Sequence, residues 1–463
     1  MSAVREENKM GVMPVGKLLI SMALPMILSM LVQALYNIVD SIFVSRISQD
    51  ALSAVSLAFS LQNLMIAVGA GTGVGINAFL SRSLGEKDYE TANKVANHTV
   101  YFWGISYLIF LTIGLTLTHA YYASQTSDAA IINYGLQYTD VILCCSFGLF
   151  AQMFSERLLT STGRTFLAMV IQMTGACINM VLDPIMIFGL LGFPALGIRG
   201  AAIATCTGQC IAGVLGIILN FKKNKDIELK LKYLKPEGYI FKRVYKVGIP
   251  SIVMGSIGSV MVYGLNKIII DFTKTAVAVF GAYFKLQSFV FMPIFGLNNG
   301  IIPIIAYNYG ARKTDRIYKT IRLALVFAIC TMSVGLLTFE TIPQVLLSLF
   351  RSNDPAENAA LIEIGVPALR IIGLHFIVAG FCIVIGSTFQ ALGKANYSLV
   401  VSLMRQLVVL LPAAYLLSLT GNLNNVWFAF PIAECMSFGV TTFFYRTRIK
   451  KLIDSRGTEN DLV

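Results

Sequence analysis

Three polar residues stand inside apolar stretches of the chain: Asp40, Asn179 and Asp183. An ionisable side chain at membrane depth costs several kcal/mol, so such residues are candidates for function. Asn179 and Asp183 are four residues apart and share one face of a helix. If Asp40 faces them, the two carboxyl groups would share a proton near neutral pH, or the same oxygens and the Asn179 carbonyl would ligate Na+. The three residues therefore predict a site for H+ or Na+.

Hydroxyl groups from Tyr138 or Thr205 would complete a shell of hard oxygen ligands around such a cation. The competing interpretation gives Asp40 a structural role, in which its side chain caps its helix near the outer end. Asp183 precedes Pro184 deep in an apolar run, which favours a functional role for its carboxyl group.

Glu156 is a second candidate for a protonatable site, in another apolar run. Its neighbour Arg157 points about 100° away on a helix, so the two side chains need separate partners.

The second half of the chain is richer in cations. Lys285, Arg370 and Arg405 either neutralise acids across this half or line a polar cavity. Lys267 and Asp271 are four residues apart, a spacing that predicts an ion pair along one helix.

Two prolines can make the helices that carry these groups bend. Pro25 and Pro250 each remove one helix hydrogen bond and permit a kink, which predicts two helix hinges. A hinge fifteen residues from Asp40 can couple cation binding to helix shape. The glycine-rich run 69–75 fits a loose GxGxxG pattern, but it lies in an apolar run, so close helix packing explains it better than a nucleotide loop. The sequence contains no GxxxxGK[ST] loop, and an ATP-driven pump is unsupported.

The elements that position these residues are membrane helices. Of the 463 residues 56% are hydrophobic and only 13% are charged, against about 25% charged residues in soluble domains. A membrane span needs about 20 apolar residues in a helix. The apolar runs predict an all-α membrane protein with twelve spans: 17–44, 51–80, 95–118, 130–160, 166–192, 198–221, 243–272, 276–308, 318–342, 360–392, 396–419 and 424–446.

Lysine and arginine are distributed unequally between the two sides of these spans. If both termini share a side, that side holds Arg5, Lys9, Lys17, Arg82, Lys87, Lys94, Arg164, Lys222 to Lys246, Arg312 to Arg322, Lys394 and Arg446 to Arg456. The other side holds only Arg46, Arg199, Lys274 and Arg351. By the positive-inside rule both termini are cytoplasmic. The net charge of +12 thus reflects membrane topology and does not indicate nucleic acid as a partner.

The two halves of the chain repeat. Residues of the first half align with residues of the second half at a constant offset in sequence: Pro25 with Pro250, Gly75 with Gly300, Gly85 with Gly310 and Lys94 with Lys319. At a slightly larger offset, Gly163 aligns with Gly393. Such duplication is typical of transporters whose two bundles move around a central cavity. The expected organisation is an N-terminal six-helix bundle (1–221), a basic cytoplasmic linker (222–242), a C-terminal six-helix bundle (243–446) and a cytoplasmic tail (447–463).

Four segments resemble the multidrug and toxic compound extrusion (MATE) family: Ala23-Leu-Pro-Met-Ile, Tyr36-Asn-Ile-Val-Asp-Ser-Ile-Phe, Ile178-Asn-Met-Val-Leu-Asp-Pro-Ile and Gly197-Ile-Arg-Gly-Ala-Ala-Ile-Ala-Thr. The resemblance covers nearly the whole chain. It implies two six-helix lobes that open alternately, with efflux driven by H+ or Na+.

In the branch that resembles DNA-damage-inducible protein F, the coupling site lies in the N-terminal lobe. The resemblance places that site on Pro25, Asp40, Tyr138, Asn179, Asp183 and Thr205. Tyr36 and Asn37, from the same motif as Asp40, join Glu156, Lys285, Arg370 and Arg405 as candidates for a second ionisable or substrate site.

The resemblance thus implies a non-enzymatic antiporter of the plasma membrane. We expect it to act as a monomer without a bound cofactor and to contact drugs, organic cations and membrane lipid. The alternative is a flippase for lipid-linked oligosaccharides, which would use the C-terminal cations to hold a pyrophosphate. A membrane-embedded enzyme is disfavoured because the three histidines form no HExxH motif, and a channel is disfavoured by the two matched halves.

Overall fold

The computed structural model describes residues 7–350 and 355–458, and this part of the chain is helical with short connections. The long helices of the first half are α2 (Val15–Ser45), α3 (Gln49–Gly85), α4 (Tyr89–Thr116), α6 (Ala129–Cys144), α7 (Phe147–Ser161), α8 (Thr165–Phe188) and α9 (Gly197–Lys223). Those of the second half are α10 (Gly238–Ile269), α11 (Lys274–Gly310), α12 (Thr314–Thr341), α14 (Pro355–Gly373), α15 (Phe376–Ala391), α16 (Ala395–Leu403), α17 (Leu411–Ser418) and α19 (Ala429–Phe444). Short helices are α1 (Lys9–Val12), α5 (Thr118–Gln125), α13 (Pro343–Ser348), α18 (Leu423–Trp427) and α20 (Lys450–Thr458).

Among the described residues, ten helices are long and apolar enough to cross a membrane by themselves. The number of spans is twelve when each of two bent helix pairs counts as one span. The fourth and tenth spans, expected as continuous helices, are instead the pairs α6 with α7 and α14 with α15, bent by 45° and 46°. The shift that aligns Gly163 with Gly393 also aligns Cys145 with His375, so the two bends occupy equivalent positions in the repeat.

The repeat is visible in the backbone. Ser48 caps the first turn of α3 by accepting a hydrogen bond from the Ala51 backbone, and its counterpart Thr273 caps α11 by accepting one from the Thr275 backbone. Lys87 and its counterpart Arg312 both have φ of 59° in the turns after these helices. Equivalent caps and turns give the backbones of the two halves the same course.

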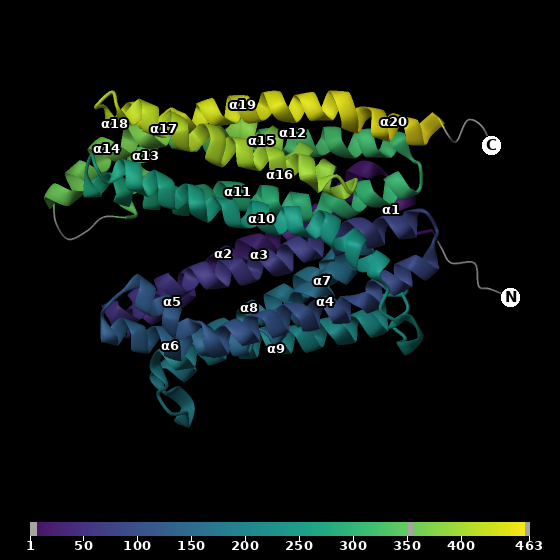
Figure 1. Ribbon diagram of the computed structural model, residues 1–463, viewed down its shortest axis with the longest axis horizontal. Coiled ribbons are helices and arrows are strands. Elements are labelled where there is room, and N and C mark those ends of the chain that lie inside the picture. Colours follow the sequence, from purple (N-terminus) through teal and green to yellow (C-terminus); the bar gives the residue numbers. More distant parts are fainter. Residues whose placement is uncertain (1–6, 351–354, 459–463) are drawn as a thin grey trace.

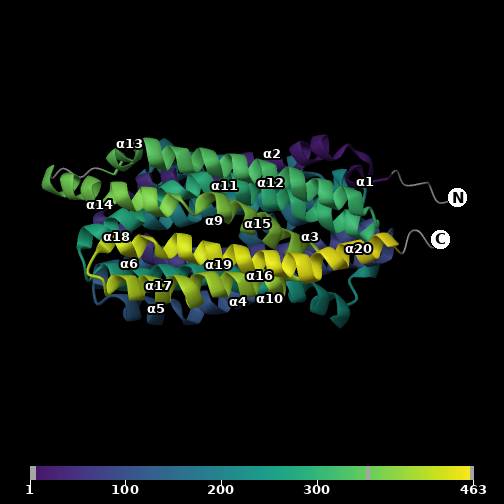
Figure 2. The same cartoon turned by 90° about the horizontal axis from the view of Figure 1, so that it is seen from above.

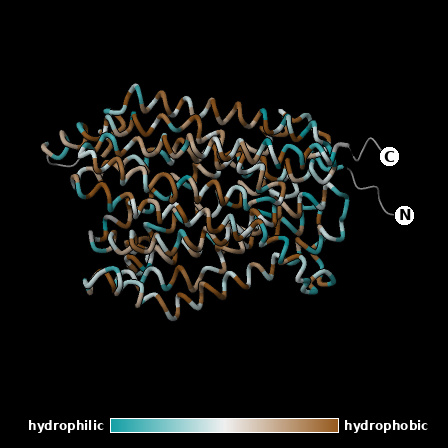
Figure 3. Tube along the Cα trace, turned by 45° about the horizontal axis from the view of Figure 1, so that its top comes forward, coloured by the Kyte–Doolittle hydropathy of each residue, from teal (hydrophilic) through white to brown (hydrophobic). Residues whose placement is uncertain are grey.

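The two halves form two helix bundles that meet along α2, α3, α10 and α11. Figure 1 shows α4, α6, α8 and α9 on one side of this seam and α12, α15, α17 and α19 on the other. In Figures 1 and 2, α1 and α20 lie at one end of the molecule, which we call the terminal face. The short helices α5, α13 and α18 lie at the opposite end, the distal face. Figure 3 shows long hydrophobic stretches along the helices. The fold is an all-α membrane protein with two six-helix bundles, as predicted.

Glycines from equivalent positions let the bundles approach closely. A Cβ added to Gly75 would lie 2.2 Å from the Val244 carbonyl oxygen, and one on its counterpart Gly300 would lie 2.9 Å from the Ala23 Cα. Near the terminal face, a Cβ on Gly85 would lie 2.0 Å from the Tyr307 carbonyl oxygen. Close packing therefore explains this glycine pattern.

We expect Gly85→Ala to lower the melting temperature of the purified protein, because the added methyl group meets backbone of the other bundle and overpacking costs about 1–3 kcal/mol. Gly104→Ala in α4 is the matched control, since no atom lies within 4 Å of its added Cβ. Equal melting temperatures for the two variants would contradict the close approach at Gly85.

The linker and the tail differ from the predicted ones. α9 continues to Lys223 and α10 begins at Gly238, so both helices extend into the predicted linker. The connection docks on α4: the Asn93 and Asn97 side-chain oxygens accept hydrogen bonds from the Glu228 and Lys230 backbones at 2.7 and 3.0 Å. The connection is thus a packed segment with its own hydrogen bonds to α4.

The predicted tail is helical as far as Thr458. Its Arg456 lies over the Tyr309 ring and 3.6 Å from Glu86 of the first bundle. Residues 459–463, together with Arg5 and Arg351 of the charge analysis, lie outside the described residues.

Candidate functional site

Four helices of the first bundle bring the predicted cation-site residues together. Asp40 lies near the distal end of α2, Tyr138 in α6, Asn179 and Asp183 in α8, and Thr205 in α9. All five side chains are buried. The helices α8 and α9 can pack closely here because Gly208 of α9 faces the backbone of Gly175 in α8.

Hydrogen bonds connect these side chains. The Asn179 amide donates to the Thr205 hydroxyl at 3.0 Å and to Asp183 Oδ1 at 3.3 Å. The carboxyl groups of Asp40 and Asp183 lie within hydrogen-bonding reach of each other. Two carboxylates at this separation cannot both carry full charge without a proton or a cation between them.

Three buried oxygens of this cluster have no hydrogen-bond partner among the described residues: Asp40 Oδ1, Asn179 Oδ1 and Asp183 Oδ2. Buried polar atoms are almost always paired, so three unpaired acceptors in one cluster indicate a missing donor or cation. Carboxylate and amide oxygens suit a hard cation such as Na+ or a proton. In the described residues no group of three or more His, Cys, Asp or Glu side chains could hold a metal ion.

Two tyrosines and a glutamine surround the cluster. The Tyr36 hydroxyl lies 3.5 Å from the Thr205 hydroxyl, and Gln62 of α3 donates to the Tyr138 hydroxyl at 3.1 Å. Tyr36, predicted for a second site, therefore contacts a residue of the predicted cation site. Asn37, predicted together with Tyr36, is exposed, and its side-chain oxygen accepts a long bond of 3.4 Å from Gln33. Sequence reasoning missed Gln62 as a site residue, although an amide in an apolar span is itself a signal.

Glu156 belongs to a different set of contacts. It is buried in α7 and accepts a hydrogen bond of 3.0 Å from Gln152, one turn earlier. Arg157 points elsewhere, as expected for neighbours on a helix, and donates to Asn299 of the second bundle at 2.8 Å. The structure thus gives Glu156 and Arg157 separate partners.

The basic residues of the second bundle do not converge on one site. Lys285 lies over the Phe350 ring, and Arg370 is exposed beside Glu340. Arg405 pairs with buried Glu434 at 3.1 Å. A pyrophosphate would need several of these cations around one cavity, and they have three different partners instead.

The predicted pair between Lys267 and Asp271 is wrong. The Lys267 ammonium group lies over the ring of Tyr263, which is four residues earlier and shares the same helix face. For an exposed lysine, contact with an aromatic ring can match an ion pair in free energy.

Pro25 and Pro250 both lie inside helices, α2 and α10. Pro25 has no N–H to bond with the Ser21 carbonyl, which is four residues earlier. The Thr165 hydroxyl, at the start of α8, donates to this carbonyl at 3.1 Å. A side chain of α8 therefore replaces the missing helix bond of α2, and the same two helices carry Asp183 and Asp40.

We expect Thr165→Val to lower the melting temperature, because it leaves the Ser21 carbonyl without a donor at a cost of about 1–3 kcal/mol. Thr165→Ser keeps the hydroxyl and should retain most of the stability. If Thr165→Val and Thr165→Ser melt at the same temperature, the hydroxyl does not compensate Pro25.

Comparisons with known proteins match this architecture. The MatE family matches residues 25–185 and 250–416. The multidrug export protein MepA of Staphylococcus haemolyticus is 27% identical over 448 residues, which are 95% of each chain. The crystal structure of MATE in complex with MaL6 superimposes with a TM-score of 0.90 at 25% identity and covers 96% of this chain and 99% of that one. An outward-facing multidrug resistance MATE family transporter gives the same TM-score and identity, with 96% and 98% covered.

Proposed function

Because the chain belongs to the MatE family of multidrug and toxic compound extrusion transporters, we propose that it exports small organic compounds, mainly cations, in exchange for H+ or Na+. It is a multi-pass membrane protein whose two bundles are built from one repeated unit. In this role it moves its substrate without changing it chemically.

The observation that carries the exchange mechanism is the set of unpaired oxygens on Asp40, Asn179 and Asp183. They lie on two helices, so a cation bound among them draws α2 and α8 together. Release of the cation leaves two carboxylates that repel each other. Cation occupancy thereby changes the relative free energy of two positions of α2.

The conformation of the two bundles supports an outward-facing state. Near the terminal face the bundles are in close contact at Gly85 and Gly310. Farther from this face, the Asn63 amide of α3 donates a long hydrogen bond of 3.4 Å to the Ser259 hydroxyl of α10 across the seam. The similarity to an outward-facing transporter agrees with this assignment.

We assign the terminal face to the cytoplasm and the protein to the plasma membrane. Lysine and arginine of the linker and of the loops 82–94 and 312–322 lie on the terminal side, which fits the positive-inside rule. The distal face then opens to the outside.

In the proposed cycle, H+ or Na+ enters from the distal side and binds at Asp40 and Asp183. Helix α2 bends near Pro25, and the compound held in the first bundle is released outside. The protein then opens at the terminal face, releases the cation and accepts the next compound. The exchange is coupled because each ligand has different affinities for the two states.

The test is efflux of the fluorescent cation ethidium from cells that express the protein, under separately imposed Na+ and H+ gradients. We expect one inward gradient to accelerate efflux above that of cells without the protein, and this gradient identifies the coupling ion. Absence of efflux under either gradient, with the protein present in the membrane, would contradict the proposed function.

A further inference from the structure

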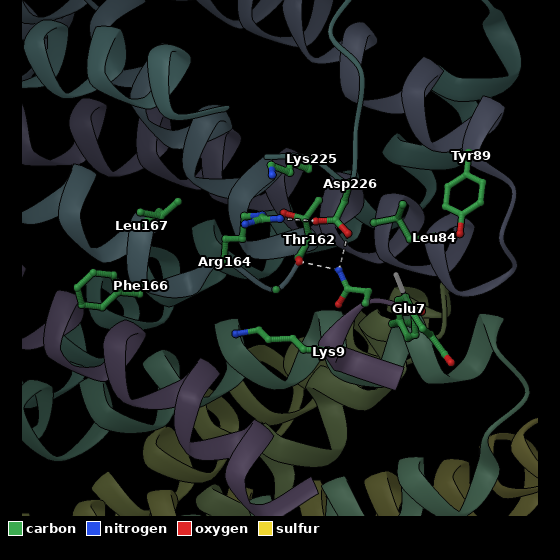
Figure 4. A pocket seen from close by; sticks show the side chains of 13 residues that line it. Glu7, Lys9, Leu84, Tyr89, Thr162, Arg164, Phe166, Leu167, Lys225 and Asp226 are labelled. Carbon is green, nitrogen blue, oxygen red and sulfur yellow. Dashed lines mark hydrogen bonds and ion pairs between the residues drawn. The ribbon is translucent and has the colours of Figure 1, made fainter. Parts of the chain in front are cut away.

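A second site lies at the terminal face, apart from the cation site. A cavity of about 790 Å³ opens between the segment around α1, the loop between α7 and α8, and the connection after α9. Figure 4 shows Lys9, Arg164 and Lys225 around this cavity. Tyr307 of the second bundle contributes to its wall, so both bundles take part.

The acids in the cavity already have partners. Glu7 pairs with Lys313 at 2.5 Å. Asp226 accepts from Arg164 at 3.0 Å and from Asn8 at 2.9 Å. Within residues 7–350 and 355–458, neither Lys9 nor Lys225 has an ion-pair partner. The cavity thus has an excess of positive charge.

Lys9 is packed against the first bundle and is partly buried. Its Cε would lie 3.2 Å from a Cβ added to Gly163, so the lysine stem packs against this glycine. Burial lowers the pKa of the Lys9 amine, and the nearby Arg164 guanidinium lowers it further. Arg164 Nε is buried and has no hydrogen-bond partner in the described part of the chain. A positive group in such surroundings is stabilised by an anion.

We propose that Lys9, Arg164 and Lys225 bind the phosphate group of an anionic ligand at the terminal face. The Arg164 guanidinium and the ammonium groups of Lys9 and Lys225 supply positive charge, and phosphate oxygens are strong acceptors for charge-assisted bonds from such groups. The phosphate group belongs either to an anionic lipid headgroup or to free phosphate, because both present the same oxygens to the three basic side chains that line the cavity.

The position of the site links anion binding to the closed state of the terminal face. Asn8 donates to the Thr162 carbonyl of the first bundle at 2.9 Å. Two residues later, the Met10 carbonyl accepts from Asn308 and Arg316 of the second bundle, each at 3.0 Å. The segment that carries Lys9 therefore bridges the bundles, and an anion held by Lys9 and Arg164 would stabilise this arrangement.

The test is a thermal-shift measurement on the full-length protein in detergent, with dioleoylphosphatidylglycerol, with neutral dioleoylphosphatidylcholine, or with inorganic phosphate. We expect phosphatidylglycerol or phosphate to raise the melting temperature of the wild type more than phosphatidylcholine does. Lys9→Gln should bind the active ligand about tenfold more weakly or worse, because it removes one charge-assisted hydrogen bond. Lys9→Arg should retain binding, as should the control Lys222→Gln, whose side chain lies outside the cavity.

A shift with phosphatidylglycerol alone that Lys9→Gln weakens would support the site and identify a lipid headgroup as its ligand. A shift with inorganic phosphate that the same variant weakens would support the site and identify free phosphate. A shift that Lys9→Gln and Lys225→Gln leave unchanged, or no shift with either ligand, would overturn the proposal. Because the readout is binding, these outcomes do not depend on whether export is observed.

Discussion

Asp183→Asn is expected to reduce cation-driven ethidium efflux by about tenfold or more while the protein still folds. The carboxyl group of Asp183 is fully buried beside Asp40 and Asn179. Asparagine keeps the shape and the bond to its neighbour but cannot take up a proton, and it removes one charge from a Na+ site. The loss of one charge-assisted contact of about 1.5–3 kcal/mol corresponds to this factor. Initial efflux rates at equal protein levels measure it.

Asp50→Asn is the matched control for this prediction. Asp50 lies in the first turn of α3 in the same bundle and is exposed, so the same chemical change should leave efflux nearly unchanged. Retention of full efflux by Asp183→Asn, under the gradient that drives the wild type, would exclude the proposed coupling site.

Arg405→Met is expected to lower the melting temperature by several degrees, the largest loss of stability that we predict. Arg405 is the ion-pair partner of Glu434, whose side chain is only 3% exposed. Removing one member of a buried pair leaves an uncompensated charge and costs about 3–5 kcal/mol. The measurement is thermal unfolding of the purified protein in detergent.

Two further variants separate charge from packing. Arg370→Met breaks a pair with Glu340 whose side chains are 52% and 36% exposed, so it should cost less than about 1 kcal/mol. The double variant Arg405→Met, Glu434→Leu removes both charges and should recover most of the lost stability. If the double variant melts no higher than Arg405→Met, the stranded charge of Glu434 is not the cause.

The sequence by itself determined the membrane class, the number of spans and the repeat. Long apolar runs must be helical in lipid because every backbone N–H and C=O needs a partner within the segment. The aligned glycines also predicted the internal repeat, and Gly75 and Gly300 do lie at equivalent contacts between the bundles. These features depend on local composition and spacing, which are read directly from the chain.

The candidate site could be predicted only as a set of residue types. Asn179 and Asp183 share a helix face because of their spacing, and the structure joins them by a hydrogen bond. That Asp40 approaches them, and that Gln62 reaches Tyr138, depends on how four helices pack. Asn37 has the same sequence context as Tyr36 but lies on the exposed side of α2.

Tertiary structure alone decided which partner each remaining polar group found. Arg405 pairs with Glu434, Arg157 reaches Asn299, and the Thr165 hydroxyl occupies the place of the N–H that Pro25 lacks. It also decided the bends in the fourth and tenth spans and the docking of the linker on α4. The physical reason is the range over which each property is set. The hydrophobicity of a segment depends on its own composition. A hydrogen bond or ion pair depends on distances of a few ångströms between segments that are far apart in the chain.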